Sequence, residues 1–311
     1  MRRASLLAAT FAVASLVTVT GCSSGAGAAG AASPGAAGST ATVSVVASTN
    51  VYGDIVQAVG GDAVTVTSII SSPDRDPHEY EADAQTQLAL SKAQLVVENG
   101  GGYDDFVDTM LSSAPSKPVT INVTDLSGYD QEPADGEFNE HLWYDLPTVA
   151  KLASRLSTDL AAAAPAQAAT FAANAKTFTA QLQKLQEQEA ALKAEHGGEG
   201  VAITEPVPGY LLAAAGLTNK TPAEFSEAIE EDTDVPPAAL KQTLDLFDQR
   251  QVALLAYNEQ TSGPQTEAVL AAAKRHDIPV VPVTETLPEG QSYLVWMQAT
   301  ITAVGDALGT S

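Results

Sequence analysis

The alternation of short β-branched runs with helical segments constrains the fold of this chain more than any other feature. In the first half, residues 51–59 and 84–93 have helical periodicity and separate runs that are typical of strands. The predicted strands are 42–48, 64–70, 94–98 and 119–123. Short apolar strands divided by helices favour a parallel sheet that is covered on both faces.

The middle of the chain changes to a helical composition from residue 146 to residue 196, interrupted only near Pro165. Residues 167–196 are rich in Ala, Gln, Leu, Lys and Glu, and apolar side chains recur there at helical spacing. A continuous helix over this stretch would be about 45 Å long, more than one lobe needs. We therefore expect a helix that links two lobes, with two shorter helices as the alternative.

The α/β rhythm resumes after Gly197 and Gly198. Strands are expected at 201–204, 252–257 and 279–283, and helices at 209–215, 238–249, 265–276 and 292–308. We infer two α/β lobes with a linking helix between them. The predicted boundaries are an N-terminal lobe at 42–164, a linking helix at 165–196 and a C-terminal lobe at 197–311.

The first 22 residues have the order of features found in a lipoprotein export signal. Arg2 and Arg3 precede an apolar stretch at 6–17, and small residues then lead to Cys22, the only cysteine of the chain. The apolar stretch is short for a bilayer about 30 Å thick, which favours cleavage and lipidation of Cys22 over a permanent span. We expect a cell-membrane lipoprotein outside the cytoplasm.

Residues 23–41 are almost wholly Gly, Ala, Ser and Thr, a composition typical of a flexible tether. Its root-mean-square reach is on the order of 25 Å, which would keep the folded part near the membrane. The net charge of −23 disfavours phosphate backbones and anionic lipid surfaces as partners. It suits a cationic ligand, although an acidic surface that keeps the protein soluble accounts for the charge equally well.

Metal-binding side chains stand at the ends of predicted strands or in the loops beside them. His78 follows the second strand, His141 precedes the long helical region, Glu205 follows the strand at 201–204, and Glu285 follows the last strand. Ligands gather at the carboxyl ends of parallel strands, and imidazoles with carboxylates can hold a divalent transition metal. His196 and His276 end predicted helices and need no further role.

Several motifs resemble those of the substrate-binding lipoproteins of zinc and manganese ABC importers, the TroA-like cluster A-I proteins. The similarity runs from about residue 42 to residue 308. It is carried by Asp76-Pro77-His78-Glu79-Tyr80-Glu81, Gln94-Leu95-Val96-Val97-Glu98-Asn99-Gly100, His141-Leu142-Trp143, Thr204-Glu205 and Thr284-Glu285-Thr286-Leu287. The resemblance implies two four-stranded α/β lobes joined by a long helix, with His78, His141, Glu205 and Glu285 binding one ion between them.

The chain departs from that family pattern at two ligand positions. Zinc receptors of this kind commonly have histidine where this chain has Glu205, and manganese receptors commonly have glutamate there. The fourth ligand is usually aspartate, so the longer Glu285 leaves direct coordination or a supporting role open. The histidine-rich insert of many zinc receptors is replaced by acidic residues: Asp130, Glu132, Asp135 and Glu137.

Two histidines with two carboxylates form a harder ligand set than three histidines, which favours manganese or ferrous iron. Zinc nevertheless binds such sites more tightly than manganese in solution. Zinc and manganese therefore both remain candidates for the bound ion. The expected function is to capture the ion outside the cell and deliver it to a membrane ABC permease. We expect a monomer that is no enzyme and has no nucleic-acid partner.

Two other function classes use similar residues. An exported metallohydrolase would need an open ligand position and a general base, for which Glu79 or Glu259 could be proposed. An organic-solute receptor would need an aromatic or arginine-bearing pocket, whereas only 5% of the residues are aromatic. We therefore favour the metal receptor.

Overall fold

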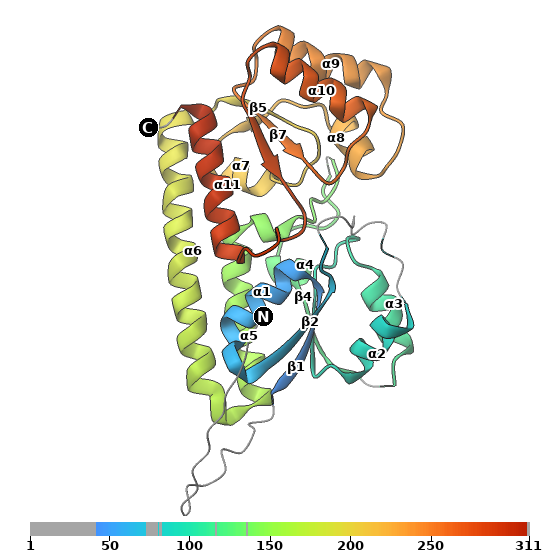
Figure 1. Cartoon of the computed structure of the whole chain (residues 1–311), viewed down its shortest axis with the longest axis vertical. Helices are drawn as coiled ribbons and strands as arrows, with labels where there is room; N and C mark the ends of the chain where they lie inside the picture. Colours follow the sequence, from blue (N-terminus) through green and yellow to red (C-terminus); the bar gives the residue numbers. More distant parts are fainter. Residues whose placement is uncertain (1–41, 73–79, 81–82, 116, 135, 310–311) are drawn as a thin grey trace, which may run out of the picture. The chain divides into compact units, whose positions relative to one another are not determined.

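The computed structural model describes residues 42–72, 80, 83–115, 117–134 and 136–309 (Figure 1). These residues belong to one compact unit, Thr40–Ser311. The expected export signal with Cys22, the tether at 23–41 and the loop that carries His78 lie outside the described residues. None of the described helices has the length and apolar character required to cross a membrane.

The first sheet contains four parallel strands in the order β2-β1-β3-β4. The strands are β1 (Val43–Thr49), β2 (Val64–Ile70), β3 (Leu95–Glu98) and β4 (Val119–Asn122). The connecting helices are α1 (Asn50–Gly60), α2 (Ala84–Lys92), α3 (Phe106–Ser113) and α4 (Val123–Ser127), with a 3-10 turn, η1, at Gly61–Ala63. β3 is buried along its whole length, as expected for a strand covered on both faces.

The second sheet repeats this topology with the order β6-β5-β7-β8, again with parallel pairs only. Its strands are β5 (Gly200–Ile203), β6 (Thr218–Asn219), β7 (Leu255–Asn258) and β8 (Val280–Val283). Its helices are α7 (Gly209–Ala214), α8 (Ala223–Glu230), α9 (Pro237–Asp248), α10 (Pro264–Arg275) and α11 (Tyr293–Leu308). The expected pair of four-stranded parallel sheets flanked by helices is therefore confirmed.

Three helical elements connect the sheets: η2 (Leu142–Tyr144), α5 (Leu146–Ala163) and α6 (Ala168–His196), with a 3-10 turn, η3, at Pro165–Gln167. Pro165 separates α5 from α6 because it has no amide hydrogen to continue the helix. α6 is one continuous helix of 29 residues, so the alternative of two shorter helices is wrong. It ends before Gly198, whose φ of 94° favours glycine.

α6 packs against elements of both halves, with contacts to α1, α5, α7 and α11 (Figure 1). The largest apolar cluster includes Val97 of β3, Leu182 of α6 and Ile203 of β5, so one core extends from one sheet to the other. This shared core is formed by burial of apolar surface, the main favourable term in folding. It gives the two sheets a common support.

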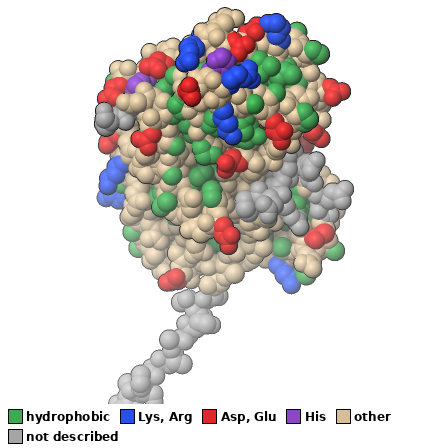
Figure 2. Space-filling model, turned by 45° about the horizontal axis from the view of Figure 1, so that its top comes forward, with side chains coloured by type: hydrophobic (Ala, Val, Ile, Leu, Met, Phe, Trp, Pro, Cys, Tyr) green, Lys and Arg blue, Asp and Glu red, His purple; other side chains and the backbone are tan. Residues whose placement is uncertain are grey.

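Strand order reverses between β1 and β3 in the first sheet and between β5 and β7 in the second. The carboxyl ends of strands at such switch points are the places where parallel sheets bind ligands. Asp and Glu side chains are dispersed over the face shown in Figure 2, in agreement with the acidic composition.

Candidate metal centre

Three polar side chains meet at the carboxyl edge of the second sheet. Glu205 follows β5 after Thr204, Asn258 is the last residue of β7, and Glu285 follows β8 after Thr284. The three residues are 2%, 0% and 2% exposed, respectively. The Nδ2 group of Asn258 donates to Glu205 Oε2 and, at 2.9 Å, to Glu285 Oε1. One amide therefore holds both predicted carboxylate ligands at the switch point.

Further hydrogen bonds fix the loops that carry these residues. Gln260 Oε1 accepts from the backbone N–H groups of Glu285 at 2.6 Å and Thr286 at 3.1 Å. Thr204 Oγ1 accepts from the backbone N–H of Asn258 at 2.9 Å. The ends of β5, β7 and β8 are thus tied together, which orients the carboxylates before any ligand binds.

His141 approaches from the other half of the molecule, in the loop that leads into η2, and its side chain is fully buried. Its Nδ1 atom lies 2.8 Å from Asn139 Oδ1, which also accepts from the backbone N–H of His141 at 3.1 Å. In a neutral imidazole, Nδ1–H donates to this oxygen and leaves the lone pair of Nε2 for a metal. Asn139 therefore selects the tautomer that can bind a metal through Nε2.

The same asparagine also connects the two halves. Its Nδ2 group donates to the carbonyl oxygen of Pro206 at 3.0 Å, and its own carbonyl oxygen accepts from the Tyr210 hydroxyl at 2.7 Å. Pro206 directly follows Glu205 in the sequence. The position of the His141 ring is thereby linked to the loop that presents a carboxylate from the opposite half.

Glu230, the last residue of α8, lies beside His141. Its Oε1 atom is 3.2 Å from His141 Nε2, and its side chain is 10% exposed. One ligand atom each from Glu140, His141 and Glu230 lie within 4.8 Å of one another. Glu140 and Glu230 are not among the ligands predicted from the sequence. For Glu230 the reason is that no helix is predicted at α8, and local spacing does not relate residue 230 to residue 141.

An aromatic residue of the first half, Tyr103, borders the site. Tyr103 follows three glycines with positive φ, Gly100, Gly101 and Gly102, a backbone path that residues with a Cβ atom rarely take. The Tyr103 hydroxyl donates to Glu285 Oε2 over a long 3.5 Å contact, and the ring centroid is 6.1 Å from that of His141.

The electrostatics of the site favour a cation. Burial, followed by repulsion from Glu230, raises the pKa of Glu205 to about 8, and hydrogen bonds such as that from Asn258 lower it only in part. Burial alone would lower the pKa of His141, but the carboxylates of Glu230, Glu140 and Glu285 raise it to about 10. The Oε1 atom of Glu205 is buried without a hydrogen-bond partner in the described part of the chain. A bound cation would relieve both the repulsion and this unmet acceptor.

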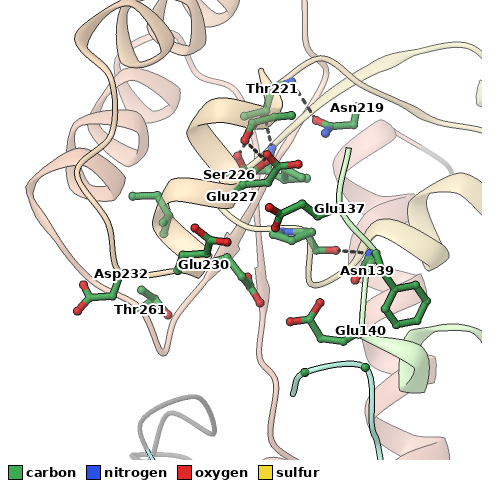
Figure 3. A pocket seen from close by; sticks show the side chains of 18 of the residues that line it. Glu137, Asn139, Glu140, Asn219, Thr221, Ser226, Glu227, Glu230, Asp232 and Thr261 are labelled. Carbon is green, nitrogen blue, oxygen red and sulfur yellow. Dashed lines mark hydrogen bonds between the residues drawn. The ribbon is translucent and has the colours of Figure 1, made fainter. Parts of the chain in front are cut away.

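A cavity of about 850 Å³ opens beside these residues and is lined from both halves. Glu137 and Glu140 come from the loop before η2, whereas Glu227 and Glu230 come from α8. In Figure 3 the four carboxylates project from opposite sides toward the same space. The cavity therefore has an acidic lining, and two of its residues, Glu140 and Glu230, lie beside His141.

The structure describes three of the four ligands predicted from the sequence, and His78 lies outside the described residues. The Asn258 side chain donates hydrogen bonds to both Glu205 and Glu285. The negative charge of Glu285 also contributes to raising the pKa of His141. Of the two bases considered for a hydrolase, Glu79 also lies outside the described residues, and Glu259 is exposed. His196 pairs with Glu199 at 2.9 Å and His276 with Asp248 at 2.8 Å, at or just beyond helix ends.

Comparison with curated proteins gives relatives at low identity. The chain is 27% identical over 145 residues to a manganese-binding lipoprotein, MntA, of Halalkalibacterium halodurans, covering 47% of this chain and 48% of that protein. It is 26% identical over 224 residues to the iron ABC transporter substrate-binding lipoprotein MtsA of Streptococcus pyogenes, covering 64% of this chain and 71% of the relative.

Solved structures share the fold. The periplasmic zinc-binding protein TroA from Treponema pallidum superimposes with a TM-score of 0.70 at 19% identity, over 86% of this chain and 99% of that chain. The family model described as zinc-uptake complex component A, periplasmic (ZnuA), matches residues 45–307. The match spans both sheets and every described residue of the candidate site, so this chain belongs to the ZnuA family of periplasmic zinc-uptake components.

Proposed function

We propose that the protein is an extracytoplasmic receptor that captures one divalent transition metal ion and delivers it to an ABC importer in the membrane. The observation that carries this proposal is a pair of buried carboxylates, Glu205 and Glu285, held by one amide, with the charge of Glu285 acting on the buried imidazole of His141 from the other half of the fold. A site of this kind suits a small cation. Family membership and the names of the relatives support a role in metal uptake.

The proposed ligands are His78, His141, Glu205 and Glu285. His78 would come from the segment after β2, an edge strand whose carboxyl end faces the same side as that of β1. Asn258 supports direct binding by Glu285, because one amide orients this carboxylate together with that of Glu205. The four side chains would supply nitrogen and oxygen donors suited to a first-row divalent ion.

Zinc and manganese are the proposed cargo ions. Oxygen-rich ligand sets suit manganese and ferrous iron, whereas zinc has the higher intrinsic affinity for nearly any nitrogen and oxygen site. The named relatives include manganese, iron and zinc proteins, in line with a site that accepts more than one ion. Elemental analysis of protein purified from its native host identifies the ion that is loaded in the cell.

The receptor would be a monomer held to the outer surface of the cell membrane by lipid on Cys22, with residues 23–41 as a tether. It would release the ion when docking to the permease changes the geometry between the two halves. The lipoprotein names of the relatives support this location. Capture and release require no chemical conversion of the ion, and the family is described as an uptake component.

Metal titration of the full chain tests the proposal. Wild-type protein is expected to bind one Zn²⁺ or Mn²⁺ per chain, and His141→Ala or Glu205→Ala is expected to weaken binding by at least ~100-fold, since each removes a direct ligand. His196→Ala, which removes a histidine at the end of α6, is the control and should bind as wild type. Binding that survives both site substitutions would contradict the proposal.

A further inference from the structure

The position of Glu230 relative to His141 is that of two ligands of one ion. The Oε1 atom of Glu230 is 3.2 Å from Nε2 of His141, the nitrogen that Asn139 leaves available. With metal–nitrogen and metal–oxygen bonds of about 2.1 Å, neighbouring ligand atoms lie about 3.0 Å apart in an octahedron and about 3.4 Å apart in a tetrahedron. The observed separation falls between these two values.

An ion bound to His141 Nε2 cannot avoid this carboxylate. It would enter the space between the two atoms, so Glu230 must either bind the ion or swing away. The side chain is only 10% exposed, and its Oε1 atom already lies where it can reach an ion on His141 Nε2. Coordination is therefore the better outcome for Glu230.

Two further observations associate Glu230 with a ligand. The buried Oε1 atom of Glu205 has no hydrogen-bond partner in the described part of the chain, and Glu230 is the charged group with the largest influence on Glu205. Glu230 also lines the acidic cavity (Figure 3), and its Oε1 atom lies beside His141 Nε2. A cation that enters the cavity comes close to Glu140 and Glu230, which both line it.

We propose that Glu230 is a ligand of the cargo ion and that, with Glu140 and His141, it forms the part of the site that first receives the ion from the acidic cavity. This inference rests on the proposed function, because it assumes that a metal is the cargo. Glu140 and His141 belong to one half of the fold and Glu230 to the other, so an ion held by all three would join the halves directly. One more carboxylate also makes the ligand set harder.

Substitution of Glu230 tests the inference on the full chain with Zn²⁺ and Mn²⁺ at pH 7.5. Glu230→Gln keeps the shape of the side chain and is expected to weaken binding of both ions by at least ~10-fold, the lower range for changes in and around metal sites. Glu227→Gln is the matched control, because it removes the same charge from the same helix and cavity. It should stay within about twofold of wild type, as expected for a charge that makes no direct contact.

The visible absorption spectrum of bound Co²⁺ gives a second readout that depends on the ligands. Glu230→Gln is expected to change the band shape, since an amide replaces a carboxylate, and Glu227→Gln is expected to keep the wild-type spectrum. If Glu230→Gln does not fold, Glu230→Asp keeps the charge but shortens the side chain, and it should also weaken binding and change the spectrum.

Equal effects of Glu230→Gln and Glu227→Gln would overturn the inference, because the contribution would then come only from charge in the cavity. An unchanged Co²⁺ spectrum in both Glu230 variants would overturn it as well. Failure of the proposed function gives a different result, in which wild type binds no ion or His141→Ala binds as tightly as wild type.

Discussion

The Nδ1 atom of His141 lies 2.8 Å from Oδ1 of Asn139, whose amide nitrogen reaches across to the carbonyl oxygen of Pro206. A single asparagine thus sets the tautomer of a candidate metal ligand and connects it to the loop after Glu205. Residues that orient a ligand in this way influence metal affinity although they never touch the ion.

Removal of this orienting group should weaken metal binding. Asn139→Ala is expected to raise the Kd for Zn²⁺ by about 10-fold or more, because the ring loses the acceptor that fixes its tautomer and direction. Calorimetric titration measures the change. Tyr210→Phe is the control: it removes the hydrogen bond to the Asn139 carbonyl but leaves the ring acceptor in place. An equal loss in both variants would assign the effect to the contact between the halves instead.

The amide of Asn258 should be needed to hold two carboxylates close together. Asn258→Ala removes the donor shared by Glu205 and Glu285, so the metal Kd is expected to rise by ~10- to 100-fold. Asn174→Ala is the control. Asn174 on α6 donates to the carbonyl oxygen of Val59 in α1, so this substitution removes a similar hydrogen bond that involves no candidate ligand. Metal affinity that is unchanged in Asn258→Ala would contradict the role assigned to this amide.

Metal binding should release protons. In the metal-free protein the pKa of His141 is raised to about 10 and that of Glu205 to about 8, so both groups carry a proton at pH 6. A metal requires both to be deprotonated, and affinity should therefore rise with pH, by up to about tenfold per unit for each proton released. Titrations between pH 6 and pH 8 in buffers with different ionisation enthalpies count the protons. Affinity that does not change over this range would exclude ligation by these two residues.

Glu189 should make folding stability depend on pH. This residue of α6 is 4% exposed, and burial, followed by the nearby Asp145, raises its pKa to about 8. The folded state therefore holds a proton that the unfolded chain loses above about pH 4.5, so stability should fall as the pH rises from 5 through 8 and then level off.

Glu189→Gln removes this charge. We expect the variant to be more stable than wild type at pH 9, on the order of 2 kcal/mol, and nearly equal to it at pH 5. Urea unfolding at the two pH values measures the difference. Glu187→Gln, at an exposed position on the same helix, is the control. This account would be contradicted if the difference in stability between Glu189→Gln and wild type were no larger at pH 9 than at pH 5.

The order of strands and helices could be predicted because it is local information. The long apolar period of 167–196 predicts α6, and β-branched runs predict seven of the eight strands within a few residues. β6 has only two residues and produces no run that a pattern could detect. α3, α4 and α8 have no predicted counterpart, because each has at most eight residues and so shows too little helical periodicity.

The site was less predictable because it depends on contacts between residues far apart in the sequence. Glu205 and Glu285 could be chosen because they follow predicted strands. Asn258 carries the same signal, but the predicted strand ends at residue 257, one residue before the end of β7. The approach of Glu230 to His141 is set by the packing of two halves and leaves no mark in local spacing.

One ion should bind between the halves at His141, Glu205 and Glu285. A crystal structure of the metal-loaded protein, with anomalous diffraction measured at the metal edge, tests it most directly. We predict one anomalous peak within ~2.3 Å of His141 Nε2 and of a carboxylate oxygen from both Glu205 and Glu285, distances typical of transition-metal ligands. A peak at another location, or a loaded protein in which these side chains keep away from the ion, would contradict the account.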